Sequence, residues 1–453
     1  MDRLEDLGVR VNGAVASRSV AIIGGGYAGM AAAVRLAELG VTSTVFEAGK
    51  ILGGRARRVE YRGSNIDNGQ HILSGAYTEL LRLMTLVGVP ATAYQRVPLT
   101  LTFGMPPVFS LRAPKLPQPL HMAMALLTAH GLNWRERFAA IRLMQALKSS
   151  LFKLDAALTV AELLKTHHQP LKLIQYLWQP LTISALNTPI ETASAQVFAN
   201  VLRDALAASR SASDLILPKV DLSRLFPEPA AAWLAARGSQ VWMGERVTAI
   251  EKNQTGFAVS YGITREEFSG VIVAVAPHQL DALQTGDIAI QKIFTESTAH
   301  FQYEPITTIY LALPPPSRPL AAPMLGRTDG FVQWFFDRGA LNGEPGLYAG
   351  VVSASGPHEN LSLDELANAA LIELREWLPD LPEPLWHKVV HEKRATFACT
   401  PALMRPAAET TVPGLVLAGD YIACDYPATL EAAVRNGNHA AEVIHKNMQS
   451  TRQ

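Results

Sequence analysis

The sequence lacks an excess of charge of either sign. It contains 40 Lys and Arg residues and 40 Asp and Glu residues among 453, so its formal net charge is zero. Binding to nucleic-acid phosphates requires a basic excess, and the balanced charge therefore argues against a nucleic-acid partner. Charged residues make up only 18% of the chain, below the roughly 25% of an average soluble domain, which favours an enzyme that handles an apolar compound.

Cysteine and long apolar runs are also scarce. Cys399 and Cys424 are too few for a disulfide framework or a cysteine-based zinc site, so we expect no metal and a reducing cytoplasm. The longest uncharged stretch, residues 116–134, is interrupted by prolines and histidines and lacks the ~20 consecutive apolar residues of a membrane-spanning helix. Peripheral contact with the inner face of the membrane through an amphipathic surface stays open.

A glycine-rich turn follows the first predicted strand. Residues 19–23 are apolar and mostly β-branched or small, as in a strand buried on both faces of a parallel sheet. Gly24, Gly26 and Gly29 come next, before a helix and a second strand that ends at Glu47. In such a βαβ unit the glycines let a pyrophosphate approach the helix N-terminus, and the acidic side chain binds ribose hydroxyls. The segment predicts a dinucleotide site.

Two further segments favour a permanently held FAD over an exchangeable nicotinamide. Gly53, Gly54 and Arg55 allow the backbone to pass close to the nucleotide, and the guanidinium can neutralise its pyrophosphate. Near the C-terminus, Gly419 and Asp420 follow a buried apolar strand, where a carboxylate can contact the ribityl or pyrophosphate region of a flavin. A second GxGxxG motif is absent, so the sequence does not identify the electron donor.

These motifs resemble those of the superfamily of FAD-dependent amine oxidases and phytoene desaturases, and the resemblance covers nearly the whole chain. It implies that the backbone of Val247 lies beside the adenine. Ala428, Thr429 and Leu430 are expected to begin the last helix, whose N-terminus would stabilise negative charge on the flavin ring. We expect non-covalent FAD, with Cys424 an ordinary buried thiol.

Three softer motifs look like those of the squalene-associated branch of this superfamily, the bacterial hydroxysqualene dehydroxylases. They are DNGQH at 67–71, WQPLT with ALNTP within 178–189, and PATLE at 427–431. The resemblance implies reduction of hydroxysqualene to squalene in hopanoid or squalene biosynthesis. The allylic hydroxyl would be lost, and reduced flavin would deliver hydride to the carbon that carried it.

Loss of a hydroxyl requires an acid, and His71 is the candidate because imidazole titrates near neutral pH. Gln70 is expected to border the substrate, and Asp67 to orient His71. A packed histidine that donates to the backbone is the alternative. The residues expected to contact a long-chain isoprenoid, with plain core packing as their alternative, are Trp178, Gln179, Trp334 and Tyr426.

The order of the predicted elements indicates an α/β protein, α+β overall, in which one lobe interrupts another. A Rossmann-like FAD-binding lobe is expected from residues 19–90, 206–285 and 395–447. An inserted substrate lobe of helices and antiparallel strands is expected from residues 91–205 and 286–394. Residues 1–18 are rich in charge and have no apolar run, so they are expected to form a loose leader rather than a secretory signal.

Two other functions remain as alternatives. A carotenoid desaturase of the phytoene type, or another flavin-dependent isoprenoid desaturase, would run the same flavin in the oxidative direction. A non-catalytic prenyl-binding escort protein would have a similar fold. This alternative predicts a damaged FAD site, whereas the motifs quoted above are intact. The sequence therefore favours an FAD-dependent oxidoreductase with an isoprenoid substrate.

Overall fold

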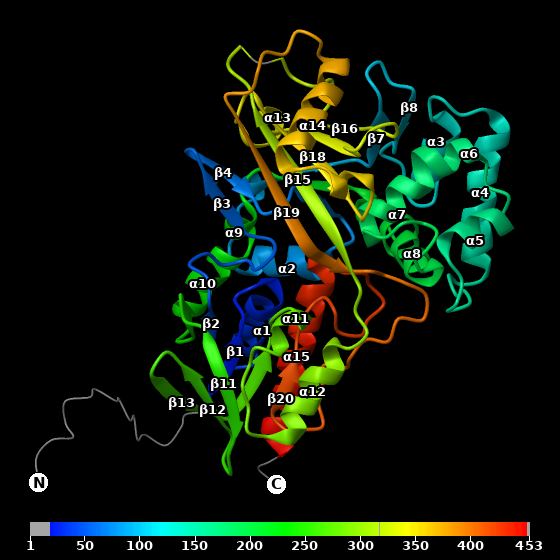
Figure 1. The fold of residues 1–453 in the computed structure, drawn as a ribbon. Coiled ribbons are helices and arrows are strands. Elements are labelled where there is room, and N and C mark those ends of the chain that lie inside the picture. The colour runs from blue at the N-terminus through cyan, green and yellow to red at the C-terminus, as the bar shows by residue number, and fades with distance from the viewer. Residues whose placement is uncertain (1–18, 317, 451–453) are drawn as a thin grey trace, which may run out of the picture.

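A five-stranded parallel sheet forms the centre of one half of the molecule (Figure 1). The computed structural model describes residues 19–316 and 318–450, and the predicted leader lies outside them. The strand order is β10-β2-β1-β14-β20, and each neighbouring pair is parallel. These strands span Ser19–Ile23 (β1), Thr42–Glu47 (β2), Gln240–Met243 (β10), Gly270–Val273 (β14) and Leu415–Leu417 (β20). Distant parts of the chain thus meet in one sheet, which confirms the predicted α/β class.

Helices α1 (Tyr27–Glu38) and α15 (Leu430–Ser450) pack against each other beside this sheet. Their close contact depends on small residues, as at Gly437, where a Cβ would lie 2.2 Å from the carbonyl oxygen of Ala28. Strand β1 is buried on both faces, since none of residues 20–23 is more than 4% exposed. The turn between β1 and α1 is therefore held at the end of a buried strand, where a site can form.

A three-stranded antiparallel sheet follows β10. It consists of β11 (Val247–Lys252), β12 (Phe257–Tyr261) and β13 (Thr264–Phe268). The sequence predicts a single strand over 241–250, but Gly244, with a φ of +81°, separates β10 from β11, and the two strands belong to different sheets. The pattern also misses β13, because its residues are mostly polar.

A seven-stranded, mainly antiparallel sheet forms the second half, in the order β19-β15-β18-β17-β16-β7-β8. The strands span Thr100–Phe103 (β7), Phe109–Arg112 (β8), Tyr303–Ala312 (β15), Met324–Gly326 (β16), Trp334–Asp337 (β17), Leu347–Ser353 (β18) and Trp386–Phe397 (β19). Apolar runs at residues 306–313, 331–337 and 347–353 predict three antiparallel strands, and the pairing of β15 with β18 and of β18 with β17 confirms them. The pattern misses β19, whose apolar residues are interrupted by lysine, glutamate and arginine. Helix α14 (Leu363–Trp377) covers β15 and β19.

A helical unit lies at one side of the molecule, next to β7 and β8 (Figure 1). Its helices are Leu120–Thr128 (α3), Trp134–Ser149 (α4), Val160–Thr166 (α5), Leu171–Leu173 (α6), Gln179–Leu186 (α7) and Ala195–Leu202 (α8), with π-helical turns at Ile174–Trp178 and Arg203–Ala207. Capping boxes explain where α4 and α5 begin, because the side chains of Asn133 and Thr159 accept hydrogen bonds from backbone N–H groups three residues ahead. Leucine, methionine and alanine at helical spacing predict a helical stretch over residues 120–206, and this stretch is thus present.

The remaining elements connect these parts. They are β3 (Arg58–Tyr61), β4 (Ser64–Asp67), β5 (Leu73–Ser74), β6 (Tyr94–Val97), β9 (Leu215–Pro218), α2 (Thr78–Leu86), α9 (Leu222–Leu225), α10 (Pro227–Ala235), α11 (Pro277–Leu280), α12 (Ile288–Thr298), α13 (Arg338–Asn342) and the 3₁₀ turns Ala91–Ala93, Ser211–Ser213 and Pro357–Asn360. Among the residues described, no helix combines the length and apolar character needed to cross a membrane.

The chain passes from the parallel-sheet half to the second half at a later residue than predicted. The sequence places the boundary after residue 285, but α12 packs on α11 beside the parallel-sheet half. The reason is its apolar face, since Ile290 and Phe294 are fully buried in the main core. The chain therefore enters the second half at β15. The assignment of cofactor and substrate to the two lobes stays a prediction.

Candidate active site

A cavity of about 1060 Å³ lies between the two halves. Its wall includes the ends of β1, β2 and β14 from one half and residues of β7, β17, α7 and α8 from the other. The sequence-predicted site residues that line it are Gly24, Gly26, Glu47, Gly53, Gly54, Arg55, Gln70, His71, Val247, Trp334, Gly419, Asp420, Tyr426, Ala428, Thr429 and Leu430. Four others, Gly29, Asp67, Trp178 and Gln179, do not line it. The structure thus brings most of the predicted residues to one place.

The three glycines of the first turn have different surroundings. A Cβ at Gly29 would lie 1.9 Å from the carbonyl oxygen of Gly24, so Gly29 is needed for the packing of α1 on the strand. Gly24 has a φ of +111°, which disfavours other residues. A Cβ at Gly26 would meet nothing closer than Gly54 Cα at 3.8 Å. The protein itself does not require glycine at 26, and the free space there fits a pyrophosphate at the N-terminus of α1.

Glu47 holds the same turn from the end of β2. Its Oε2 accepts a hydrogen bond from the backbone N–H of Gly25 (2.8 Å), and its Oε1 accepts one from Gly49 (2.7 Å). An ionised carboxylate has about four acceptor positions, so these two bonds leave capacity for hydroxyl donors. The side chain lines the cavity. This geometry fits the ribose of a dinucleotide.

Arg55 and Asp420 both line the cavity and form an ion pair there. The Arg55 Nη2 donates to Asp420 Oδ1 at 2.6 Å, and its Nη1 donates to the carbonyl oxygen of Ala395, also at 2.6 Å. The sequence predicts separate contacts of these two residues with a flavin nucleotide, whereas the structure pairs them. The carboxylate therefore offsets part of the positive charge that Arg55 would present to a pyrophosphate.

Arg405 is a residue that the sequence pattern does not indicate. Its guanidinium donates to the carbonyl oxygens of Asp420 (3.1 Å), Tyr421 (3.2 Å), Cys424 (3.2 Å) and Tyr426 (2.8 Å). These bonds hold the loop that carries Asp420 at the end of β20. An isolated arginine between two prolines and other loop residues gives no periodic signal, so only the folded loop reveals its role.

The imidazole of His71 is hydrogen-bonded to the backbone. Its Nδ1 lies 2.8 Å from the carbonyl oxygen of Gly69, which can only accept, so Nδ1 carries the hydrogen and Nε2 does not in the neutral ring. Burial lowers the pKa of His71 below its ordinary value; the Gly69 hydrogen bond opposes this effect in part, and the charge of Arg55 adds a smaller lowering. The ring is therefore mainly neutral at neutral pH. This differs from the expected acid with a pKa near neutrality.

Asp67 does not orient His71. It is 3% exposed, and its Oδ1 accepts a hydrogen bond from the backbone of Leu222 (2.9 Å). Its Oδ2 lies 3.5 Å from Nη1 of Arg338, a buried side chain that also donates to Oε1 of Gln70 at 3.0 Å. Burial raises the pKa of Asp67 to about 6, in spite of the opposing charge of Arg338. Asp67 thus belongs to a buried network behind Gln70 rather than to the cavity wall.

Two of the four predicted substrate contacts line the cavity, and two do not. Trp334 and Tyr426 line the cavity, and the Trp334 Nε1 donates to Ser184 Oγ at 3.2 Å. Trp178 is instead 1% exposed in the helical core, where its Nε1 donates to Gln169 Oε1 at 2.8 Å.

Gln179, at the start of α7, is exposed to solvent, so it too differs from the prediction. Five residues of α7 line the cavity, among them Leu181, Ser184 and Ala185, together with Pro180 and Ile183. The spacing of three and four residues from Leu181 to Ser184 and Ala185 is that of one helix face, and it is the sequence signal that could have identified them.

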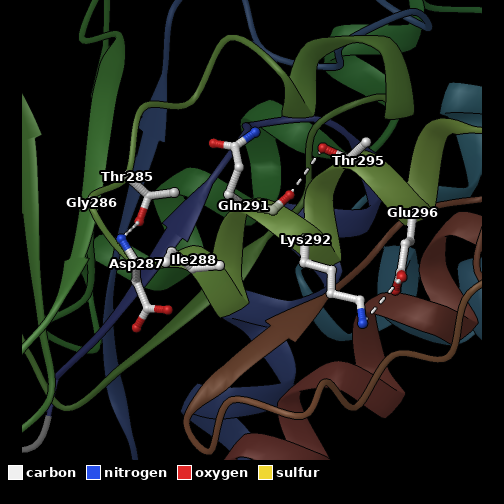
Figure 2. A pocket seen from close by; sticks show the side chains of 8 residues that line it. All are labelled: Thr285, Gly286, Asp287, Ile288, Gln291, Lys292, Thr295 and Glu296. Carbon is white, nitrogen blue, oxygen red and sulfur yellow. Dashed lines mark hydrogen bonds and ion pairs between the residues drawn. The ribbon is translucent and has the colours of Figure 1, made fainter.

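A second hollow of about 590 Å³ lies along α12 (Figure 2). It is lined by Thr285, Gly286, Asp287, Ile288, Gln291, Lys292, Thr295 and Glu296. Figure 2 shows that Lys292 and Glu296 pair with each other along the helix, at 3.7 Å, rather than converging on a ligand. None of the sequence-predicted site residues lines this hollow. Within the described chain, no three His, Cys, Asp or Glu side chains are grouped so that they could hold a metal ion.

Comparison with known proteins gives matches along nearly the whole chain. A model of the family described as flavin containing amine oxidoreductase matches residues 27–445. The hydroxysqualene dehydroxylase of Rhodopseudomonas palustris is 31% identical, over 94% of this chain and 98% of that protein. A probable zeta-carotene desaturase of Synechococcus elongatus is 23% identical over 94% of this chain and 98% of that protein. A triple mutant of putrescine oxidase shares the fold, with a TM-score of 0.71 at 18% identity, over 95% of this chain and 99% of that structure.

Proposed function

This chain belongs to the family of flavin-containing amine oxidoreductases and is an FAD-dependent oxidoreductase, and from this premise we propose that it reduces hydroxysqualene to squalene. The observation that carries the proposal is its similarity, at 31% identity, to a hydroxysqualene dehydroxylase along nearly the full length of both proteins. The cavity supports it, because nucleotide-type motifs at one end continue into apolar side chains such as Leu101, Leu181 and Phe336 at the other.

The proposed reaction replaces an allylic hydroxyl group with hydrogen. The C–O bond breaks, the oxygen takes up a proton and leaves as water, and the carbon accepts a hydride. Bound FAD in its reduced form supplies the hydride, and an electron donor of unidentified nature must restore that form in each cycle. Hopanoid or squalene biosynthesis is the proposed setting. The part left to the protein is to bind the isoprenoid, exclude water and manage one proton.

The proposed FAD contacts follow the cavity wall. Gly26 and the N-terminus of α1 would receive the pyrophosphate, Glu47 the ribose and the backbone of Val247 the adenine. Asp420 would contact the flavin end. Non-covalent binding is supported by Cys424, which does not line the cavity and whose Sγ accepts from Arg405 at 3.1 Å.

His71 and Gln70 are the proposed catalytic contacts, because both line the cavity and both are held by neighbours. A neutral imidazole with hydrogen on Nδ1 has no proton at Nε2 to donate. His71 would therefore deliver the proton to the leaving hydroxyl only in its protonated form, which is a minority at neutral pH. Trp334 and Tyr426 are the proposed walls for the substrate.

A desaturase reaction on another isoprenoid is the second candidate. The zeta-carotene desaturase relative supports it, but at 23% identity against 31% it does so less well. The escort-protein alternative has no support, since the family consists of oxidoreductases. For the location we propose the cytoplasm, with peripheral contact to the inner face of the membrane, where a water-insoluble substrate would be found.

The test uses the flavin as its own indicator. The purified protein is photoreduced without oxygen, and hydroxysqualene in detergent is added. Reoxidation of the flavin with formation of squalene is the expected result, and addition of squalene instead is the control that should leave the flavin reduced. A flavin that stays reduced with hydroxysqualene, while the oxidised protein desaturates a carotene, would replace the proposal with the second candidate.

A further inference from the structure

Exposed large apolar side chains gather on the first two helices of the helical unit. Leu120 and Met124 lie one turn apart on α3 and are 53% and 37% exposed. Trp134 and Phe138 lie one turn apart on α4 and are 62% and 52% exposed, with ring centroids 6.3 Å apart. We call these four residues, together with Arg135 and Arg142 of α4, the α3–α4 face. Large exposed apolar groups in one place mark interaction surfaces more often than scattered ones do.

Helices α3 and α4 are in contact, and a side chain of α4 is hydrogen-bonded to the end of α3. Arg137 of α4 donates from Nη2 to the carbonyl oxygen of Ala129, just after α3, at 2.9 Å. Its guanidinium also lies 4.9 Å from the centre of the Trp134 ring. The indole is therefore supported in its exposed position by a residue that connects α3 to α4.

The charge around this face differs from that of the rest of the chain. Residues 108–172 contain nine Lys and Arg residues against three Asp and Glu residues, although the whole chain is neutral. Lys115, Arg135 and Arg142 are exposed, and none of them forms an ion pair with another residue in the described part of the chain. Exposed Trp, Phe and Leu side chains flanked by unpaired cations match the chemistry of an anionic lipid surface.

We propose that the α3–α4 face docks the protein on a bilayer that contains anionic lipids. The inference deepens the proposed function, on which it rests for the nature of the substrate, because a bilayer is where a long isoprenoid alcohol dissolves. Trp134 and Phe138 enter the boundary between headgroups and acyl chains, and Arg135 and Arg142 contact lipid phosphates. A second copy of this chain does not fit the face equally well, because a symmetric dimer would place cationic surfaces against each other.

The docked face lies close to the cavity. Gln118, in the segment that leads into α3, donates from Nε2 to the carbonyl oxygen of Ala207 at 2.8 Å. Ala207 follows directly after Leu206, which lines the cavity. A bilayer bound at the α3–α4 face would therefore lie near this part of the cavity wall, which shortens the path of an isoprenoid through water.

The experiment measures binding of the flavin-loaded, full-length protein to vesicles without substrate. Vesicles of phosphatidylglycerol and phosphatidylcholine in equal parts are compared with vesicles of phosphatidylcholine alone, by flotation at low ionic strength. The double variant W134A/F138A is expected to bind the anionic vesicles at least about tenfold more weakly. The variant R135E/R142E is expected to lose about tenfold or more and to abolish the preference for phosphatidylglycerol. The matched control is I263A, which shortens a side chain that is 95% exposed on a β-turn of the other half and should bind as the wild type does.

Each outcome decides the proposal. Weaker binding of both double variants, with unchanged flavin content, supports it. Failure of the wild type to float with either kind of vesicle overturns it, as does equal binding of W134A/F138A and wild type. Dimers that W134A/F138A abolishes in sedimentation, without vesicle binding, would assign the face to self-association instead. Turnover of hydroxysqualene in detergent is recorded in parallel, because its loss in the wild type would overturn the proposed function and leave the docking result standing.

Discussion

Arg55 and Asp420 stand 365 positions apart in the sequence, and a 2.6 Å ion pair joins their side chains at the cavity. Arg55 belongs to the loop after β2, and Asp420 to the loop after β20, at the two ends of the chain's nucleotide-type motifs. Arg405 fixes the second loop through its carbonyl oxygens. The two motifs therefore form one unit, and a change in either is expected to affect the other.

Asp420→Asn is expected to weaken flavin binding about tenfold, because loss of the ion pair releases the loop after β20 and this outweighs the positive charge that Arg55 regains. A charge-assisted hydrogen bond contributes about 1.5–3 kcal/mol, and Arg55 is partly exposed. The measurement is flavin affinity by fluorescence titration of the reconstituted protein. Asp425→Asn is the matched control, because Asp425 lies on the same loop but its side chain is 69% exposed and lies 3.6 Å from Arg203 Nη2. Equal affinities of the two variants would show that the ion pair does not hold the cofactor end of the site.

Gly26→Ala is expected to impair flavin binding, whereas Gly29→Ala is expected to impair folding. At Gly26 the φ of −76° suits alanine and a Cβ has free space, so the protein without flavin should melt as the wild type does. The methyl group would fill the space assigned to the pyrophosphate, and flavin affinity should fall at least about tenfold. At Gly29 the Cβ would overlap the Gly24 carbonyl oxygen, so this variant should fold poorly.

Thermal melting with and without FAD separates these effects. A Gly26→Ala protein that binds flavin at full strength would contradict the pyrophosphate placement. A Gly29→Ala protein that melts normally would show that α1 can shift away from β1 without loss of stability.

The dinucleotide motif and the parallel sheet could be predicted because their signals are local. An apolar run, a glycine spacing and a strand-end glutamate lie within about thirty residues, a length at which a βαβ unit is self-contained. The residues that the pattern misses act at long range. Arg338 reaches Gln70 from the start of α13, 268 positions away, and β19 owes its place to pairing with β15 rather than to its own apolar pattern.

Trp178 is a residue whose place the sequence motif could not predict. A tryptophan in a motif next to an apolar helix is equally compatible with a cavity wall and with the core, and the choice depends on which face of the helix points inward. Here Gln169 satisfies the indole N–H within the core, and Leu181 and Ser184 face the cavity. Helix orientation is set by tertiary packing, which the composition of the motif does not encode.

His71 is expected to give a pH dependence of definite sign. Its pKa is lowered by burial, so the protonated form that can donate to the leaving hydroxyl grows as the pH falls from neutrality through and below about 6.5. If His71 is the acid, single-turnover reoxidation of reduced flavin by hydroxysqualene should accelerate over this range. His71→Ala should react at least about tenfold more slowly and lose this dependence, with flavin content unchanged.

His121→Ala provides a comparison, since its pKa is also lowered by burial but it lies on α3 outside the cavity. It should retain the pH profile of the wild type. A wild-type rate that does not change as the pH falls would remove His71 as the proton donor and leave it as a residue that positions the substrate.

Arg338 and Asp67 are expected to be coupled in stability. Both are almost fully buried, and Arg338 is the cation nearest the Asp67 carboxylate, at 3.5 Å. Arg338→Met would leave that carboxylate unpaired, and such a loss costs about 3–5 kcal/mol of unfolding free energy. The double variant Asp67→Asn/Arg338→Met removes the charge as well, so it should be more stable than Arg338→Met at neutral pH, as measured by urea denaturation.

The pH dependence of this pair follows from the raised pKa of Asp67, about 6 in the wild type. A folded-state pKa above the unfolded value of about 3.9 means that protonation favours the folded state as the pH falls through that interval. Without the opposing charge of Arg338 the pKa of Asp67 rises further, so the deficit of Arg338→Met relative to the wild type should shrink as the pH falls from neutrality toward about 6 and change little below it. The double variant has no carboxyl group at position 67 and should show no such change over this range. Because Arg338 also donates to Gln70, turnover should fall in both Arg338 variants but not in Asp67→Asn alone. Equal stability of Arg338→Met and the double variant at neutral pH would mean that Asp67 is neutral in folded Arg338→Met, so that removal of Arg338 leaves no unpaired charge there.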